Sequence, residues 1–237
     1  MSAAGIAGQR QPRGLVVDDA AEQLNLVSGL LTKEGFDVRA ASDGEEALRI
    51  ARTHEPDVVV LDLSLPGVDG VEVCRRLRVF SDAYVIMLTS RTEEIDLLVG
   101  LSVGADDYMT KPFSPRELTA RVRTLLRRPR EAARANRVRK FGGLEVDADA
   151  RTVRVDGREV ELTRIEFDLL DALTERPRLT YQRSTLLERV WGPNWFGDAH
   201  IVEVHMANLR GKLGDDPRRP RFIKTIRGIG YRMVDAS

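Results

Sequence analysis

The chain is poor in cysteine and in aromatic residues, and it has no long hydrophobic run. Cys74 is the only cysteine among 237 residues, which excludes an internal disulfide and a cysteine-based zinc cage, and we expect it to fill a core position. No stretch approaches the roughly eighteen apolar residues of a membrane-spanning helix, and the N-terminus lacks the apolar core of a secretory signal. We therefore expect a cytoplasmic protein without a membrane partner.

The chain also lacks net charge, but its two halves differ. Residues 14–126 carry 12 Lys and Arg against 20 Asp and Glu, whereas residues 127–237 carry 23 against 17. This asymmetry suits an acidic, cation-binding half joined to a half that meets polyanions. Two solvated surfaces would produce it equally well, so charge alone does not decide the function.

Hydrophobic periodicity divides the chain into segments. Residues 1–13 are small and polar, and we expect a disordered tail. Across residues 14–126, five short apolar segments alternate with five amphipathic ones, which predicts an α/β domain with a five-stranded parallel sheet and helices on both faces. The expected strands are 15–17, 37–40, 58–61, 84–88 and 107–109, and the expected helices are 24–31, 44–52, 71–77, 93–103 and 115–126.

A second pattern follows a basic segment. Residues 127–140 hold seven basic residues, one acid and a proline, which indicates an interdomain linker. Residues 141–237 then predict an α+β domain that opens and closes with antiparallel hairpins. The hairpin strands are expected at 144–146, 152–155, 160–162, 222–226 and 231–234, with an Asp156-Gly157 turn. Helices are expected after a capping box at Thr163 and Glu166, at 184–191 and at 199–213.

Five polar residues follow the strands of the predicted parallel sheet. Asp18 and Asp19 follow the first strand and Asp62 ends the third. Such a carboxylate cluster favours a hard divalent cation such as Mg²⁺. Thr89 and Lys111, at the ends of the fourth and fifth strands, add groups that can hold phosphoryl oxygens. Each residue alone also fits a structural role, but five at matching strand ends favour phosphoryl transfer to a carboxylate.

The motifs around these residues resemble bacterial receiver domains, which have a flavodoxin-like fold. They are Val16-Val-Asp-Asp19, Val60-Leu-Asp-Leu-Ser-Leu-Pro-Gly67, Met87-Leu-Thr-Ser90 and Gly104-Ala-Asp-Asp-Tyr-Met-Thr-Lys-Pro-Phe113. The resemblance implies a phosphoacceptor at Asp62, a sensor histidine kinase as donor and a switch role for Tyr108. It further implies phosphoryl contacts from Thr89 and Lys111, and a Mg²⁺ site made by Asp18, Asp19, Asp62 and the carbonyl of Ser64.

The second half contains a candidate recognition helix and a basic hairpin. At helical spacing Ile201, Val204, Met206 and Leu209 would face inward, leaving four polar side chains outside: His205, Asn208, Arg210 and Lys212. Asn and Arg can read base edges, whereas Lys contacts phosphates. A solvated helix face would show the same pattern. The hairpin adds Lys224, Thr225, Arg227 and Arg232, which suit a narrow minor groove.

This half resembles the winged-helix effector domain of the OmpR/PhoB family. The motifs are Leu162-Thr-Arg-Ile-Glu-Phe167, Glu203-Val-His-Met-Ala-Asn-Leu-Arg-Gly-Lys-Leu213 and Thr225-Ile-Arg-Gly-Ile-Gly-Tyr-Arg232. The resemblance implies a transcription factor that binds double-stranded promoter DNA and is not an enzyme. It also implies that the loop 192–198, with Trp195 and Phe196, contacts RNA polymerase, although these aromatics would equally cover the core.

The same resemblance implies a homodimer on phosphorylation, formed through segments 93–103, 107–109 and 115–126. Asp107 and Arg121 are then expected to form an ion pair of that interface. Leu97 stands where relatives usually carry a basic residue opposite Glu117, so this second bridge is expected to be absent. The rival function is a DNA-binding protein that is independent of phosphorylation and uses its receiver only to dimerise.

Overall fold

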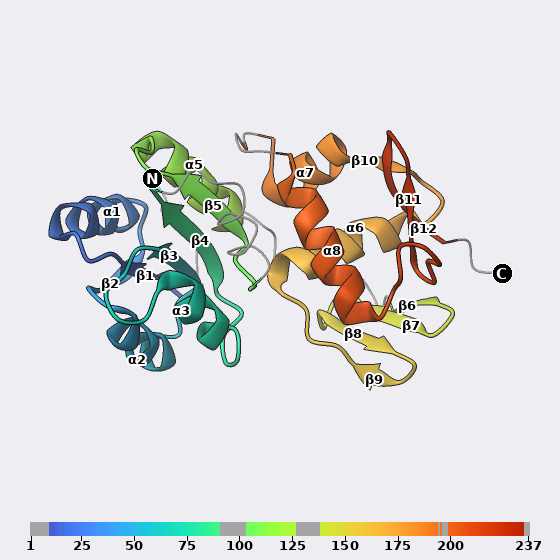
Figure 1. Ribbon diagram of the computed structural model, residues 1–237, viewed down its shortest axis with the longest axis horizontal. Helices are drawn as coiled ribbons and strands as arrows, with labels where there is room; N and C mark the ends of the chain where they lie inside the picture. The colour runs from blue at the N-terminus through green and yellow to red at the C-terminus, as the bar shows by residue number, and fades with distance from the viewer. Residues whose placement is uncertain (1–9, 91–102, 127–137, 194, 196–198, 235–237) are drawn as a thin grey trace, which may run out of the picture.

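The computed structural model describes residues 10–90, 103–193, 195 and 199–234 except for 127–137, and Figure 1 shows two domains side by side. The tail up to residue 9, nearly all of the predicted helix 93–103 with Leu97, the linker up to residue 137 and Phe196 lie outside the described residues. None of the described helices is long and apolar enough to cross a membrane.

The first domain has a five-stranded parallel sheet in the order β2-β1-β3-β4-β5. Its strands are β1 (Arg13–Val17), β2 (Asp37–Ala41), β3 (Val58–Asp62), β4 (Tyr84–Thr89) and β5 (Asp107–Thr110). Its described helices are α1 (Ala21–Lys33), α2 (Gly44–His54), α3 (Gly70–Leu77) and α5 (Pro115–Leu126). Figure 1 shows the helices on both sides of the sheet. The predicted flavodoxin-like fold is confirmed.

The central strands explain the valine-rich sequence. Every residue of β3 is buried, because β1 and β4 pair with it on both sides and helices cover the sheet. Cys74, on α3, is fully buried, and burial raises the pKa of its thiol to about 12. It fills the core as expected.

The second domain places three helices between two antiparallel sheets (Figure 1). The first sheet has the order β6-β7-β8-β9, made of β6 (Val138–Phe141), β7 (Leu144–Asp147), β8 (Thr152–Val155) and β9 (Arg158–Glu159). The second has the order β10-β12-β11, made of β10 (Tyr181–Gln182), β11 (Ile223–Ile226) and β12 (Gly230–Met233). The helices are α6 (Arg164–Glu175), α7 (Arg183–Trp191) and α8 (Ile201–Leu213).

Two short-range predictions in this domain, the Asp156-Gly157 turn and the capping box at Thr163, are confirmed. Asp156 and Gly157 both have positive φ, 50° and 80°, as the turn residues of a tight hairpin require. At the start of α6 the Glu166 amide donates to the Thr163 hydroxyl, and the Thr163 amide donates to the Glu166 carboxylate. This is the predicted capping box.

Other elements differ from the prediction. β9 lies at Arg158–Glu159 rather than at 160–162, because the tight turn brings those residues opposite Val155 and Arg154. β6 begins at Val138, inside the segment expected as linker, and β10 was not predicted. β10 forms because Tyr181 pairs with the distant Tyr231 on β12, which a short segment of sequence does not reveal, whereas β6 pairs with the neighbouring β7 across the Gly142-Gly143 turn.

Candidate functional site

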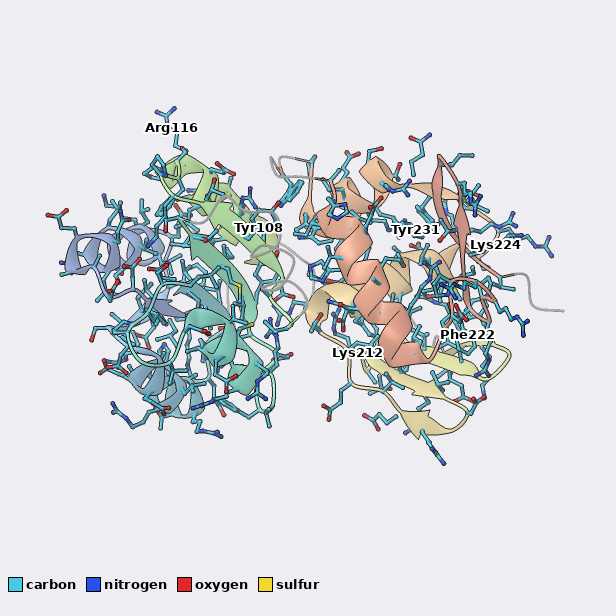
Figure 2. The ribbon with its side chains drawn as sticks, viewed as in Figure 1. Tyr108, Arg116, Lys212, Phe222, Lys224 and Tyr231 are labelled. Carbon is cyan, nitrogen blue, oxygen red and sulfur yellow. The ribbon has the colours of Figure 1, made fainter. Side chains whose placement is uncertain are left out.

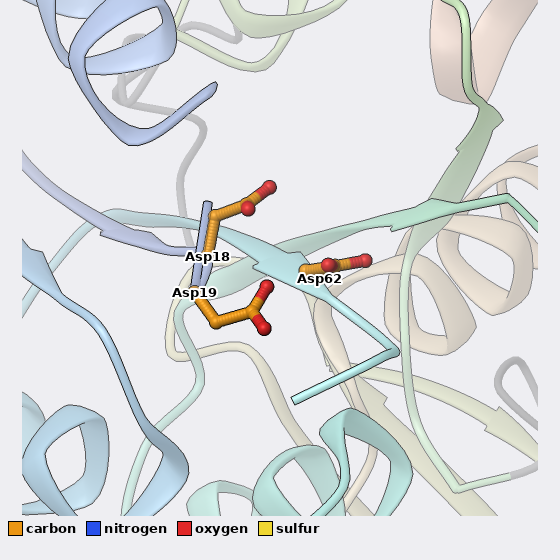
Figure 3. Close-up of side chains that lie close together, drawn as sticks. All are labelled: Asp18, Asp19 and Asp62. Atoms are coloured by element: carbon orange, nitrogen blue, oxygen red, sulfur yellow. The ribbon is translucent and has the colours of Figure 1, made fainter. Parts of the chain in front are cut away.

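Three carboxylates meet at the end of the parallel sheet. β1 and β3 are neighbours in register, with Val17 opposite Leu61, so the residues that follow them share one edge. Carboxylate oxygens of Asp18, Asp19 and Asp62 lie within 4.8 Å of one another (Figure 3). Asp18 and Asp62 are buried and Asp19 is exposed, so the cluster opens to solvent on one side.

Lys111 lies against this cluster, as expected from its position after β5. Its Nζ is 2.8 Å from Asp18 Oδ2 and 3.0 Å from Asp62 Oδ2. Burial disfavours the charged ammonium, but the hydrogen bonds to the two carboxylates outweigh this and raise the pKa of Lys111. The Lys111 amide also donates to the Thr89 carbonyl, and Thr89 is fully buried at the end of β4. Thr89 and Lys111 therefore occupy neighbouring strand ends beside the acids.

One oxygen of Asp62 is buried and has no hydrogen-bond partner among the described residues. This atom is Oδ1, while Oδ2 faces Lys111. An unpartnered buried carboxylate oxygen costs free energy, which a cation or another partner would recover. With two further carboxylates nearby, the donor set is all oxygen, which is the preference of Mg²⁺. The residues present therefore fit a magnesium ion.

Backbone packing fixes the position of Asp62. The helix α3 starts at Gly70, whose amide donates to the Leu63 carbonyl. A Cβ on Gly70 would overlap the Asp62 carbonyl oxygen and lie 2.8 Å from the Leu63 Cα. Glycine thus allows the helix to start directly against the strand end. Ser64, in the same turn, is exposed.

The predicted switch and pairing residues lie around β5. Tyr108 is half-buried and lies at the boundary with the second domain (Figure 2). Arg121 donates to Asp107 Oδ1 and to Glu117 Oε1, both at 2.6 Å. Asp107 and Arg121 thus form an ion pair within one chain, and both side chains are almost completely buried.

The predicted DNA-contact residues fall into two groups. Exposed or half-exposed residues are Asn208, Lys212, Lys224, Thr225, Arg227 and Arg232. Lys212 lies near the end of α8, where its Nζ is 2.7 Å from Glu166 Oε2, and Lys224 lies on β11 (Figure 2). A helix and a hairpin therefore present basic side chains on the second domain.

The prediction that His205 and Arg210 face outward from α8 is wrong. His205 is fully buried, with its Nε2 3.3 Å from the Asp106 carbonyl of the first domain. Arg210 is 8 % exposed and donates to the Ile223 carbonyl at 2.9 Å and to Thr225 Oγ1 at 2.8 Å. Helical spacing predicts which residues share a side of α8. It does not predict that the receiver covers the side with His205 and that β11 covers the side with Arg210.

Sequence reasoning also missed Trp191. It is 2 % exposed, and its Nε1 donates to the Asp106 carbonyl at 3.2 Å. The two residues are 85 positions apart, and no motif links them, so no local signal could have identified this contact.

Two family models match the two domains. The response regulator receiver domain matches residues 15–123, and the C-terminal domain of transcriptional regulatory proteins matches residues 157–233. The DNA-binding response regulator MtrA of Mycolicibacterium smegmatis is 44 % identical over 220 residues, which are 93 % of this chain and 96 % of that protein.

Solved structures also match both domains. DrrB, an OmpR/PhoB homologue of Thermotoga maritima, is 35 % identical and has a TM-score of 0.51, with 95 % of this chain and 100 % of DrrB covered. A mutant of RitR is 27 % identical and has a TM-score of 0.74, with 94 % of this chain and 99 % of the RitR chain covered.

The acidic pocket and the basic helix and hairpin thus occur in the two domains that these relatives share. The chain belongs to the OmpR/PhoB family of DNA-binding response regulators.

Proposed function

We propose that Asp62 accepts a phosphoryl group from a sensor histidine kinase and that this event controls promoter binding by the second domain. The observation that carries the proposal is the unpartnered, buried Oδ1 of Asp62 beside two further acids and the Lys111 ammonium. A carboxylate in such a site can act as nucleophile, and the groups around it can hold the incoming anion.

The proposed magnesium ligands are the carboxylates of Asp18, Asp19 and Asp62 and the carbonyl of Ser64. When bound, Mg²⁺ neutralises charge on the transferring phosphoryl group. Lys111 already lies within 3.0 Å of Asp62 Oδ2 and is the ammonium that would contact one phosphoryl oxygen. Thr89, at the neighbouring strand end, would donate its hydroxyl to another.

In the proposed transfer, an Asp62 oxygen bonds to phosphorus while the bond from phosphorus to the kinase histidine nitrogen breaks. The nitrogen keeps the electron pair, and the product is an aspartyl phosphate. Thr89 is then drawn toward the phosphoryl group. Tyr108, half-buried on the adjacent strand, would move into the space that Thr89 leaves and so change the β5 surface.

Phosphorylation can be tested with acetyl phosphate and Mg²⁺ as a small-molecule donor. We expect an adduct of one phosphoryl group by intact-protein mass spectrometry, and none on Asp62→Asn. Chelating Mg²⁺ with EDTA should abolish the adduct on the unchanged protein. Equal labelling of both proteins would place the acceptor elsewhere. No labelling of either would favour the phosphorylation-independent rival, in which the receiver serves only for dimerisation.

The proposed DNA contacts come from α8 and the β11–β12 hairpin. Asn208 would read a base edge, Lys212 would contact a phosphate, and Arg227 lies exposed at the hairpin turn. Thr225, Lys224 and Arg232 would complete the hairpin contact. Arg227→Ala should weaken DNA binding and flatten its dependence on salt, because one cation no longer displaces counterions from the duplex. Glu161→Ala removes an exposed acid instead of a base, so it should not flatten the dependence of DNA binding on salt.

Two further partners belong to the proposal. Phosphorylated receivers would form a homodimer through the surface of β5 and α5, which places two second domains on tandem half-sites. In that dimer Asp107 and Arg121 would exchange their present contact for one across the interface. The segment 192–198 would contact RNA polymerase. Its Trp195 is half-buried. Sedimentation of the protein with and without acetyl phosphate tests the dimer.

A further inference from the structure

Several buried or partly buried polar contacts join the two domains. Trp191 Nε1 and His205 Nε2 both lie within hydrogen-bond distance of the Asp106 carbonyl, at 3.2 and 3.3 Å. Beside them, Trp195 Nε1 donates to Asp107 Oδ2 at 3.3 Å, and the Arg121 guanidinium lies 5.3 Å from the Trp195 ring. The second domain thus binds the receiver surface at the start of β5.

Beside the carboxyl group of Asp107, His205 is a titratable group at the centre of this contact. It is completely buried, and its ring is 5.6 Å from the Trp191 ring. In the tautomer with hydrogen on Nε2, the ring donates to the Asp106 carbonyl. Its Nδ1 is buried and has no hydrogen-bond partner among the described residues. A second proton, on Nδ1, would therefore have no acceptor there.

The charged groups near His205 do not compensate a positive imidazolium. From the receiver, Arg78 is nearby, and its Nη2 is 2.6 Å from Asp106 Oδ2, so that carboxylate is already paired. From the second domain, Glu166 on α6 is paired with Lys212 on α8 at 2.7 Å. α7 contributes the uncharged Trp191. Each acid near His205 thus has its own cation.

We propose that His205 is a proton-sensitive latch, which holds the two domains together while it is neutral and releases the second domain when it is protonated. Release exposes the imidazole to water, where the added proton is solvated. The direction follows from geometry: the neutral ring completes the contact, whereas the charged ring would be buried with an unpartnered N–H. Because His205 lies on α8, opening also uncovers that side of the proposed recognition helix.

The size of the effect follows from linkage. Burial is the main cause that lowers the pKa of His205 from 6.5 to about 4 in the closed form. A group whose pKa is lower in the closed form than in the open form favours opening as pH falls through the open-form pKa. Between pH 7.5 and 5.5 the ratio of open to closed protein should rise about tenfold.

The chain contains its own reporters for this test. It has two tryptophans, Trp191 and Trp195, and both lie at the domain contact. On lowering the pH from 7.5 to 5.5, we expect acrylamide quenching of tryptophan fluorescence to increase and the radius of gyration from small-angle scattering to rise. The circular dichroism of the backbone should stay unchanged. Neither readout needs phosphate or DNA, so this test is independent of the proposed phosphorylation and DNA contacts.

Variants identify the group that titrates. His205→Gln can still donate to the Asp106 carbonyl but cannot take up a proton, so its quenching and radius should not depend on pH. The other two histidines give matched controls: His54→Gln and His200→Gln should keep the response. Trp195→Phe removes the hydrogen bond to Asp107 but not the latch, so opening should remain pH-dependent and occur at higher pH.

Two results would overturn the proposal. The first is a full-length protein whose quenching and radius are the same at pH 7.5 and 5.5. The second is a His205→Gln protein that opens on acidification to the same extent as the unchanged protein or Trp195→Phe. Another group would then be titrating.

Discussion

Replacing Arg210 by alanine should destabilise the second domain, because this side chain supports the β11–β12 hairpin from inside the fold. Its Nη2 donates to the Ile223 carbonyl and to the Thr225 hydroxyl, at 2.9 and 2.8 Å. Its guanidinium carbon lies 5.6 Å from the centre of the Tyr231 ring. In Arg210→Ala the Ile223 carbonyl loses this donor. Because Ile223 is fully buried, water cannot easily replace it.

The expected loss can be estimated from the two hydrogen bonds. Each hydrogen bond from a charged donor contributes about 1.5–3 kcal/mol, and the half-buried Thr225 hydroxyl can recover part of its share from water. We therefore expect the free energy of unfolding to fall by about 2–3 kcal/mol. With a urea slope on the order of 1 kcal/mol/M, the unfolding midpoint should fall by about 2 M.

Urea unfolding of the full chain, followed by tryptophan fluorescence, measures this loss, because Trp191 and Trp195 both lie in the second domain. Arg227→Ala is the matched control: Arg227 is exposed at the hairpin turn, and its loss should change the free energy of unfolding by no more than about 0.5 kcal/mol. If Arg210→Ala unfolds at the same urea concentration as the unchanged protein but loses DNA affinity, the inward role assigned to Arg210 is refuted.

Two other substitutions test the packing of each domain. Gly70→Ala should lower the yield of acetyl-phosphate labelling, because its Cβ would overlap the Asp62 carbonyl; Gly29→Ala, where a Cβ meets nothing within 4 Å, is the control and should label normally. Thr163→Ala should lower the free energy of unfolding by about 1 kcal/mol in the urea assay, because it removes the hydroxyl of the capping box, whereas Thr163→Ser keeps it and should unfold almost as the unchanged protein does. Unchanged labelling in Gly70→Ala, or equal stability of Thr163→Ala and the unchanged protein, would contradict these contacts.

The acidic pocket could be predicted because it follows from local sequence and one topological rule. The run of valines before Asp62 specifies a buried strand, and parallel strands bring their carboxyl ends to one edge of the sheet. Asp18 and Asp62 therefore had to lie close together once their strands were neighbours. The capping box at Thr163 was predictable for a similar reason, since it involves only backbone and side chains within one turn.

The positions of His205 and Arg210 were decided only by tertiary structure. Helical spacing shows which residues share a side of α8, but not which sides other parts of the chain cover. His205 is buried by Asp106, which lies 99 residues earlier in the chain, and Arg210 by the hairpin that follows α8. Short-range patterns of residues were enough to predict the two folds and the acidic edge. The contact between the domains depends on long-range packing, which no short-range pattern records.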